Sequence, residues 1–264
     1  MRKTYSLLIA LSLFGFIRAQ NTFLFAPRFL PDRKYTTRLF TDKKMTAETP
    51  SGIAKKQNEK GQREFTITTG STHEDSTFTV VLEIIKFTSS KDKQEVPEHT
   101  TLLGTATINS MPEFHNVNAP GKSAQFERTL LNSLGDILKQ FPLEKKQLAI
   151  GDTMLQVSTL NMDVASLTVK SNTVYKVIAV KNGIARLEQS DLFTIEGGNQ
   201  TVSMTGSGTG SGSLFYNIKE QLIIRESSNT SLTLHMGGET NSVNVSVIQK
   251  GNRSTSVKPF RPAK

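Results

Sequence analysis

The sequence predicts an α+β fold dominated by antiparallel sheet, in which a curved sheet or half-barrel carries one packed helix. Two β-prone runs, residues 174–180 and 184–188, flank Lys181-Asn182-Gly183. Asn-Gly between such runs is typical of a type I′ hairpin, because both central residues of that turn need positive φ. Short alternating apolar runs recur along the chain, and only residues 123–141 have convincing helical periodicity.

This pattern divides the chain into five parts. They are a signal peptide, a β-rich N-terminal half, an amphipathic helix, a β-rich C-terminal half and a basic tail, at residues 1–19, 20–122, 123–141, 142–250 and 251–264. The tail contains two prolines, and we expect it to be frayed. The lead-in at residues 20–31 is apolar, and two alternatives stay open for it: packing across the domain or mobility.

The N-terminus has the features of an export signal. Arg2 and Lys3 precede an apolar run at residues 6–17, and Ala19 supplies a small residue at the expected cleavage point. The alternative is an N-terminal anchor, but the run is short for a membrane span. We expect an exported protein, periplasmic or secreted, with no transmembrane segment after the signal is removed.

The composition excludes several kinds of chemical site. The chain has 264 residues, of which 36% are apolar, so it can fill a core. It contains no Cys, which excludes disulfides, a thiol nucleophile and thiolate metal sites. The formal net charge is +9, and loss of Arg2, Lys3 and Arg18 lowers it by three to +6. This charge favours anionic lipid or glycan surfaces, or simply keeps the protein soluble; no basic stripe with interleaved aromatics indicates nucleic acid.

The first half contains four expected strands, at residues 34–40, 64–69, 77–88 and 100–108. In the third of these, alternation places Phe78, Val80, Leu82 and Ile84 on one face. Pro50, Gly52 and Gly61 indicate a turn-rich segment at residues 49–62, and residues 111–122 are expected to be a linker.

The helix follows this linker. Its apolar stripe recurs at helical spacing and comprises Phe126, Leu130, Leu131, Leu134, Ile137, Leu138 and Phe141. Ser123 is the expected N-cap and Pro142 the stop signal. Such a helix covers one face of a sheet or binds a membrane, and the acids and bases mixed on its polar face favour the sheet.

The second half is expected to form short strands separated by turns, including a turn at Ser227-Ser228-Asn229. Between them, glycine alternates with Ser and Thr at Gly206, Gly208, Gly210 and Gly212. No Lys and no helical pattern follow, so a phosphate-binding loop is excluded. The segment is either a flexible loop or, as we favour, a strand with one bare face that another backbone or the helix approaches closely.

The order of these parts resembles a family of uncharacterised exported proteins of the Gram-negative envelope, a domain of unknown function. The resemblance rests on Pro-Leu-Glu at residues 142–144, on Ile150-Gly151-Asp152-Thr153, and on Leu214-Phe215-Tyr216-Asn217. The combination of sheet and helix also resembles the half-barrels of periplasmic lipoprotein carriers, in which a curved sheet wraps a helix and leaves an apolar groove. This resemblance implies a binding function.

No catalytic constellation emerges. His73, His99, His115 and His235 lack metal-site spacing, and His73-Glu74-Asp75 is interpreted as a polar loop. The three candidate acids are Asp152, Asp163 and Asp191, which turns and exposed strand positions explain. We therefore expect a protein that is not an enzyme and has no catalytic residues, metal or cofactor.

The leading hypothesis is reversible binding of an apolar or amphiphilic, lipid-like ligand between helix and sheet. It places Leu130, Leu134, Ile137 and Leu138 of the helix against Val80, Leu82 and Ile84, although the same pattern is expected of an ordinary core. The alternative is an envelope structural or interaction module with a protein partner.

Overall fold

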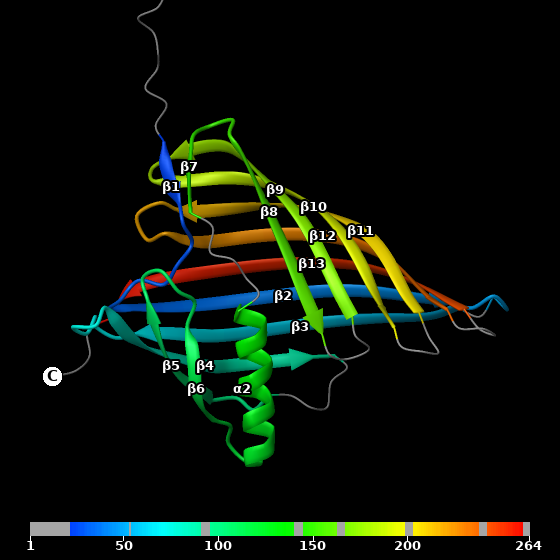
Figure 1. Cartoon of the computed structure of the whole chain (residues 1–264), viewed down its shortest axis with the longest axis horizontal. Coiled ribbons are helices and arrows are strands. Elements are labelled where there is room, and N and C mark those ends of the chain that lie inside the picture. The colour runs from blue at the N-terminus through cyan, green and yellow to red at the C-terminus, as the bar shows by residue number, and fades with distance from the viewer. Residues whose placement is uncertain are drawn as a thin grey trace, which may run out of the picture.

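One open, curved antiparallel sheet of eleven strands dominates the protein (Figure 1). A computed structural model describes residues 22–52, 54–90, 96–139, 145–162, 167–198, 203–237 and 242–260. The strand order is β6-β5-β4-β3-β2-β13-β12-β11-β10-β9-β8, and β1 pairs with β7 separately. The prediction of a mainly antiparallel, curved sheet is confirmed, and the described residues contain one helix, α2. The predicted signal peptide lies outside the described residues.

Most of the strands are long. Their bounds are β1 Phe23–Phe25, β2 Arg33–Glu48, β3 Ala54–Thr69, β4 Thr77–Ser89, β5 Thr100–Thr107, β6 Glu113–Asn118, β7 Lys146–Leu148, β8 Thr153–Met162, β9 Leu167–Lys181, β10 Ile184–Gly198, β11 Ser203–Asn217, β12 Leu222–Gly237 and β13 Ser242–Pro259, and the helix α2 spans Ala124–Lys139.

The two ends of the chain meet in the middle of the sheet. Every other pair of neighbouring strands is consecutive in sequence, but β13 pairs with β2, with Val257 opposite Tyr35 and Gly251 opposite Thr41. We call this pairing the seam. Strands from both predicted halves therefore belong to one continuous sheet.

The turn between β9 and β10 has the conformation predicted from the sequence. Asn182 and Gly183 have φ of 51° and 74°, and they connect β9 to β10 as the predicted Asn-Gly hairpin. Positive φ at both positions is the signature of the type I′ turn.

Several segments expected to be irregular are strands instead. Most of the turn-rich segment at residues 49–62 belongs to β3, and the linker at 111–122 contains β6. Residues 227–229 lie inside β12, where Asn229 faces Ser211 on one side and Lys250 on the other. Partners on both sides supply the hydrogen bonds that such polar residues do not favour locally.

The tail is the segment whose structure differs most from its prediction. Residues 251–259 form the second half of β13 and pair with β2, so the prediction of a frayed tail is wrong there. The Phe260 N–H also donates to the Asp32 carbonyl, at 2.9 Å, and residues 261–264 lie outside the described part of the chain.

The sheet has two unlike faces. Strand alternation puts the buried side chains on what we call the inner face, in three clusters, and leaves a mostly polar outer face. The first cluster lies on β8–β12 beneath β1 and β7, the second on β2–β5, and the third between α2 and β4–β6.

The lead-in packs across the inner face. Phe23 and Phe25 are buried in the first cluster. The Tyr216 hydroxyl accepts a hydrogen bond from the Ala26 N–H at 3.1 Å and donates to the Leu24 carbonyl at 3.1 Å. The Leu30 N–H donates to the Tyr35 hydroxyl at 2.7 Å. Two buried tyrosines therefore hold the backbone of this segment against the sheet, and of the two alternatives packing is the one observed.

Helix α2 packs beside β6. The Phe126 N–H donates to Ser123 Oγ at 3.3 Å, so the predicted N-cap is confirmed. Phe126, Leu130 and Leu131 pack against the third cluster, whose members are Leu102, Val117 and Ala119, with Leu82 and Phe114 beside them. No helix among the described residues is long and apolar enough to cross a membrane.

The predicted partners of the helix are only partly those observed. Leu82 shares a cluster with the helix, whereas Val80 packs in the second cluster with Tyr35 and Phe78. Leu82 also packs against the second cluster, so alternation along β4 identified the shared face but not which neighbours each side chain meets there. The side chains of Leu134, Ile137 and Leu138 lie outside the described residues.

Replacing Tyr216 with Phe should destabilise the protein, because the Ala26 N–H would be left buried without its acceptor. We expect a loss of about 1–3 kcal/mol in the free energy of unfolding, measured by urea denaturation near neutral pH. Tyr175→Phe is the matched control, since the Tyr175 hydroxyl forms no hydrogen bond within the described ranges. Equal losses in the two variants would contradict this role of Tyr216.

Candidate functional site

The inner face contains an apolar pocket of about 210 Å³ between the lead-in and the seam. Its floor comes from β2, β3, β12 and β13, because inward-facing residues of these strands meet beside Pro27 and Phe29. The lining consists of Pro27, Arg28, Phe29, Thr37, Phe65, Ile67, Met111, Leu222, Ile223, Arg253 and Thr255. We call this hollow the apolar pocket.

A polar pocket of about 280 Å³ lies next to it on the same face. Arg253 lines both hollows, so they are neighbours along β13. The polar pocket is lined by Leu39, Thr41, Lys43, Glu59, Arg63, Glu226, Ser228, Gln249, Gly251 and Arg253. We call these two neighbouring pockets the inner site, which is apolar at one end and charged at the other.

Two arginines border the apolar pocket with unused donors. The Nε atoms of Arg28 and Arg253 are buried and have no hydrogen-bond partner within the described residues. Arg253 Nη2 pairs with Glu226 at 2.7 Å, which leaves its Nε free to donate. A buried donor without an acceptor costs free energy, so these groups favour an acceptor that enters the pocket.

Farther along the inner face, Asp191 anchors a hydrogen-bonded polar cluster. Its Oδ1 accepts from Thr173 Oγ1 at 2.7 Å, and Gln189 Nε2 donates to both carboxylate oxygens at 3.0 and 2.9 Å. Asp191 is only 5% exposed. The interpretation of Asp191 as an exposed strand position is therefore wrong, because its neighbours on β9 and β10 satisfy a carboxylate that faces inward.

The four alternating glycines create the space for these inward side chains. They form part of β11, as favoured from sequence, and the register places all four on the inner face. A methyl group at Gly210 would overlap the Asp191 carboxylate, and one at Gly208 would overlap Leu232 and the Ser231 carbonyl. The expected close approach is real, but it comes from neighbouring strands within the sheet.

Burial and nearby carboxylates also act on Tyr175, on the inner face of β9. Desolvation raises the pKa of Tyr175 to about 12, and the negative charges of Glu226 and Asp191 contribute, while Arg253 opposes them. The Tyr175 hydroxyl therefore stays protonated across the physiological range.

The remaining candidates from sequence lie away from the inner site. In the exposed loop at residues 73–76, Asp75 Oδ1 accepts from the Thr77 hydroxyl at 2.6 Å and the Thr77 N–H at 3.0 Å, and these bonds lower the pKa of Asp75. Asp152 accepts from the Ala149 N–H at 2.8 Å in a turn, as interpreted. Asp163 lies outside the described residues, and among those described no three His, Asp or Glu side chains gather as a metal site would require.

The sequence reasoning missed Arg28 and Arg253. Arg253 falls in the segment assigned to the tail, and Arg28 in a lead-in with no regular pattern. One signal was available: residues 249–257 alternate between outward polar side chains and the inward Gly251, Arg253, Thr255 and Val257.

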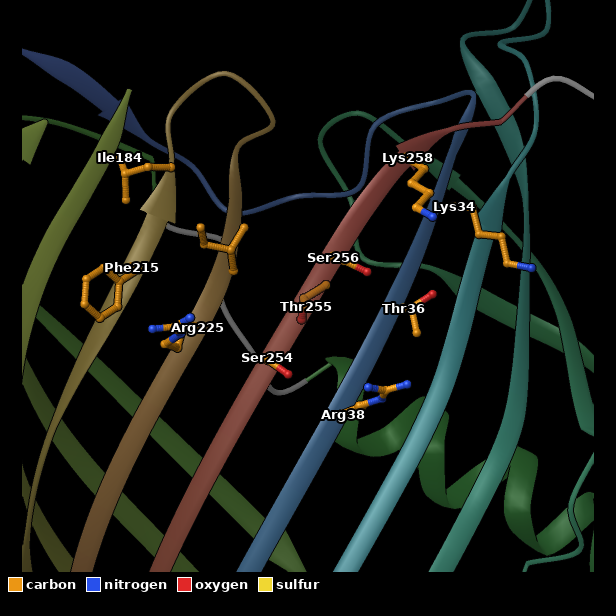
Figure 2. A pocket seen from close by; sticks show the side chains of 11 residues that line it. Lys34, Thr36, Arg38, Ile184, Phe215, Arg225, Ser254, Thr255, Ser256 and Lys258 are labelled. Atoms are coloured by element: carbon orange, nitrogen blue, oxygen red, sulfur yellow. The ribbon is translucent and has the colours of Figure 1, made fainter. Parts of the chain in front are cut away.

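The outer face holds a hollow of about 880 Å³, which we call the outer pocket (Figure 2). It also straddles the seam, on the side of the sheet opposite α2. Its lining is Lys34, Thr36, Arg38, Ile184, Phe215, Ile224, Arg225, Ser254, Thr255, Ser256 and Lys258.

Tyr175→Phe should weaken the pH dependence of stability in the alkaline range. The folded pKa of about 12 exceeds the ordinary value of 10, so between these values the unfolded chain releases a proton that the folded chain keeps. The free energy of unfolding therefore falls as pH rises through this window, by at most about 2.7 kcal/mol. Urea denaturation from about pH 9 to 11 should show a shallower decline for the variant, and parallel declines would contradict the assignment.

Comparisons with known proteins leave the chain without a family. No family model and no curated protein matches the sequence. Solved structures that match in part include OpdQ of Pseudomonas aeruginosa, with a TM-score of 0.30 and 7% identity over 86% of this chain and 100% of that one. A triple mutant of the Rhodopseudomonas blastica porin has a TM-score of 0.27 and 7% identity, covering 84% and 100%. Ail of Yersinia pestis has a TM-score of 0.17 and 6% identity, covering 85% and 99%.

These TM-scores are too low to place the chain with any of those proteins. The matches also give no support to the resemblance to lipoprotein carriers.

Proposed function

We propose that this protein is an exported, non-enzymatic binding protein that reversibly holds an amphiphile with an anionic head group in the inner site. It would work in the periplasm or outside the cell, and no bond would be made or broken. The observation that carries the proposal is the apolar pocket bordered by two arginines whose buried Nε atoms have no acceptor within the described residues.

The apolar pocket suits the tail of such a ligand. Phe65, Ile67 and Ile223 supply aromatic and aliphatic walls. Its volume exceeds the roughly 150 Å³ of an engineered apolar cavity that admits benzene. Together with the polar pocket it reaches the range of small-molecule sites, roughly 300–1,000 Å³. A short alkyl chain or a ring would exchange water for apolar contact there.

The two arginines suit the head group. A planar guanidinium donates to carboxylate or phosphate oxygens, and such charge-assisted bonds are stronger than neutral ones. Arg28 forms no ion pair within the described residues, whereas Arg253 is partly neutralised by Glu226. We therefore assign the main contact with the head group to Arg28 and a supporting contact to Arg253.

The proposed site lies in a different place from the site expected from sequence. That site lay between α2 and β4, but helix residues do not line the apolar pocket; the lead-in takes the place of the helix as cover. Leu130 instead belongs to an ordinary packed cluster with Leu102 and Val117.

Calorimetric titration of the purified protein with decanoate and with decanol tests this proposal, because the two probes share a chain and differ in the charge of the head. We expect decanoate to bind at least about tenfold more tightly, a difference of about 1.4 kcal/mol. Arg28→Gln should lower the affinity for decanoate to nearly that for decanol. The backbone bond from Arg28 N–H to the Gln221 carbonyl survives the change, so the fold should persist.

Arg186→Gln is the matched control, because it removes the same charge from the outer face and should leave decanoate binding unchanged. Equal affinity for decanoate and decanol would rule out a role for the arginines. Failure of both probes to bind would reject the amphiphile site altogether.

A second function, a protein-interaction module, is favoured by one observation. β8 is the last strand of the sheet, and no charged residue interrupts its sequence. Its outward Leu155 and Val157 are 55% and 54% exposed. An uncharged edge strand with exposed apolar side chains is a ready template for an added strand from another chain.

Photocrosslinking in the native cells tests whether β8 binds a protein partner or only exposes apolar side chains. A photoreactive amino acid at Leu155 should yield a discrete protein adduct that Val157→Lys abolishes, because a charge on the edge opposes strand addition. The same probe at Leu103, an exposed apolar position on the outer face of β5, is the control. Similar adducts from both positions would exclude a specific edge interaction.

A further inference from the structure

The outer pocket has a lining that is basic and hydroxylic but carries no carboxylate. Four cationic side chains line it, from Lys34, Arg38, Arg225 and Lys258, together with the hydroxyls of Thr36, Ser254 and Ser256. Figure 2 shows the two lysines near one another at one end, the two arginines toward the other, and the hydroxyls between them. This arrangement is independent of the inner site, since it occupies the opposite face of the sheet.

Strand register fixes the spacing of these cations. Lys34 lies opposite Lys258, and Thr36 lies opposite Ser256. Ser254 lies between Arg38 and Arg225 in one row across three strands. From ordinary strand geometry, the Cα atoms of the two arginines are about 10 Å apart, and the arginine row is about 13 Å from the lysine pair. The cations therefore frame a floor of small hydroxyls.

The lysine pair opposes the stability of the seam. Like charges directly opposite one another on neighbouring strands are destabilising. Neither lysine forms an ion pair within the described ranges, and Arg38 alone of the four does so, with Glu64 at 3.1 Å. An anionic ligand would relieve this repulsion, because it would supply the counter-charge that the protein does not.

The pocket also offers apolar surface beside the arginine row. The Phe215 ring lies 5.8 Å from the Arg225 guanidinium, and Ile184 and Ile224 complete that wall. The C–H face of a sugar ring can pack against such a wall while its hydroxyls meet the Ser and Thr floor. A ligand that combines separated anionic groups with hydroxyl-rich rings matches all three parts of the lining.

We propose that the outer pocket binds an acidic oligosaccharide, with carboxylate, sulfate or phosphate groups paired to the lysines and arginines. A flat anionic membrane fits less well, because the cations line a hollow and the apolar residues of the wall are half-buried rather than protruding for insertion. The proposal adds a second ligand class to the inner site and does not depend on it.

Binding of hexagalacturonate, compared with uncharged maltohexaose, is the first test. Calorimetry should detect hexagalacturonate binding that weakens with added salt, and no binding of maltohexaose. The double variant Lys34→Gln/Lys258→Gln should weaken the binding of hexagalacturonate at least about tenfold. Its melting temperature should stay unchanged or rise, because the substitution removes a like-charge pair.

The control is Lys170→Gln/Lys176→Gln, which removes two exposed lysines from the outer face of β9, outside the pocket. This variant should keep wild-type affinity for hexagalacturonate. Equal weakening in both double variants would show general charge attraction and overturn the pocket assignment. Binding to vesicles rich in phosphatidylglycerol without binding to hexagalacturonate would likewise overturn it, in favour of a lipid surface.

Discussion

The pairing of β13 with β2 is the contact on which both candidate sites depend. It joins residues about as far apart as the chain allows, with Val257 opposite Tyr35, and it places the two sequence halves in one sheet. Alternate residues of β13 then serve opposite faces: Arg253 borders the inner site, whereas Ser254 and Ser256 form the floor of the outer pocket. A shift of one residue in this register would exchange the two sets of side chains.

The inner face has both packed side chains and glycine positions that leave room for polar groups. Tyr35 and Tyr216 hold the lead-in against the sheet through hydroxyl-to-backbone bonds, which closes one side of the apolar pocket. On β11, glycine at position 210 makes room for the buried Asp191 carboxylate. Sheet positions without a side chain thus allow polar groups to turn inward and still find partners, as Asp191 does with Thr173.

The fold class was predictable because its signals are local. Alternation along residues 77–88 and the Asn-Gly turn identify strands and a hairpin within a few residues. Strand length was not predictable, because polar runs such as residues 54–62 extend only when a partner strand supplies hydrogen bonds. The candidate site was hidden for the same reason. Arg28 and Arg253 border one pocket only once the lead-in packs beside β12, where the Arg28 N–H donates to the Gln221 carbonyl. Contacts between segments so distant in sequence leave no local signature.

The seam also determines when binding can begin. During synthesis β2 emerges early, but its partner is complete only when residue 259 has been made. Both pockets draw lining residues from β2 and β13, so neither can be complete on a nascent chain before that point. A chain threaded across a membrane in an extended state would keep β2 unpaired on one side, and ligand capture would be confined to the compartment in which β13 arrives.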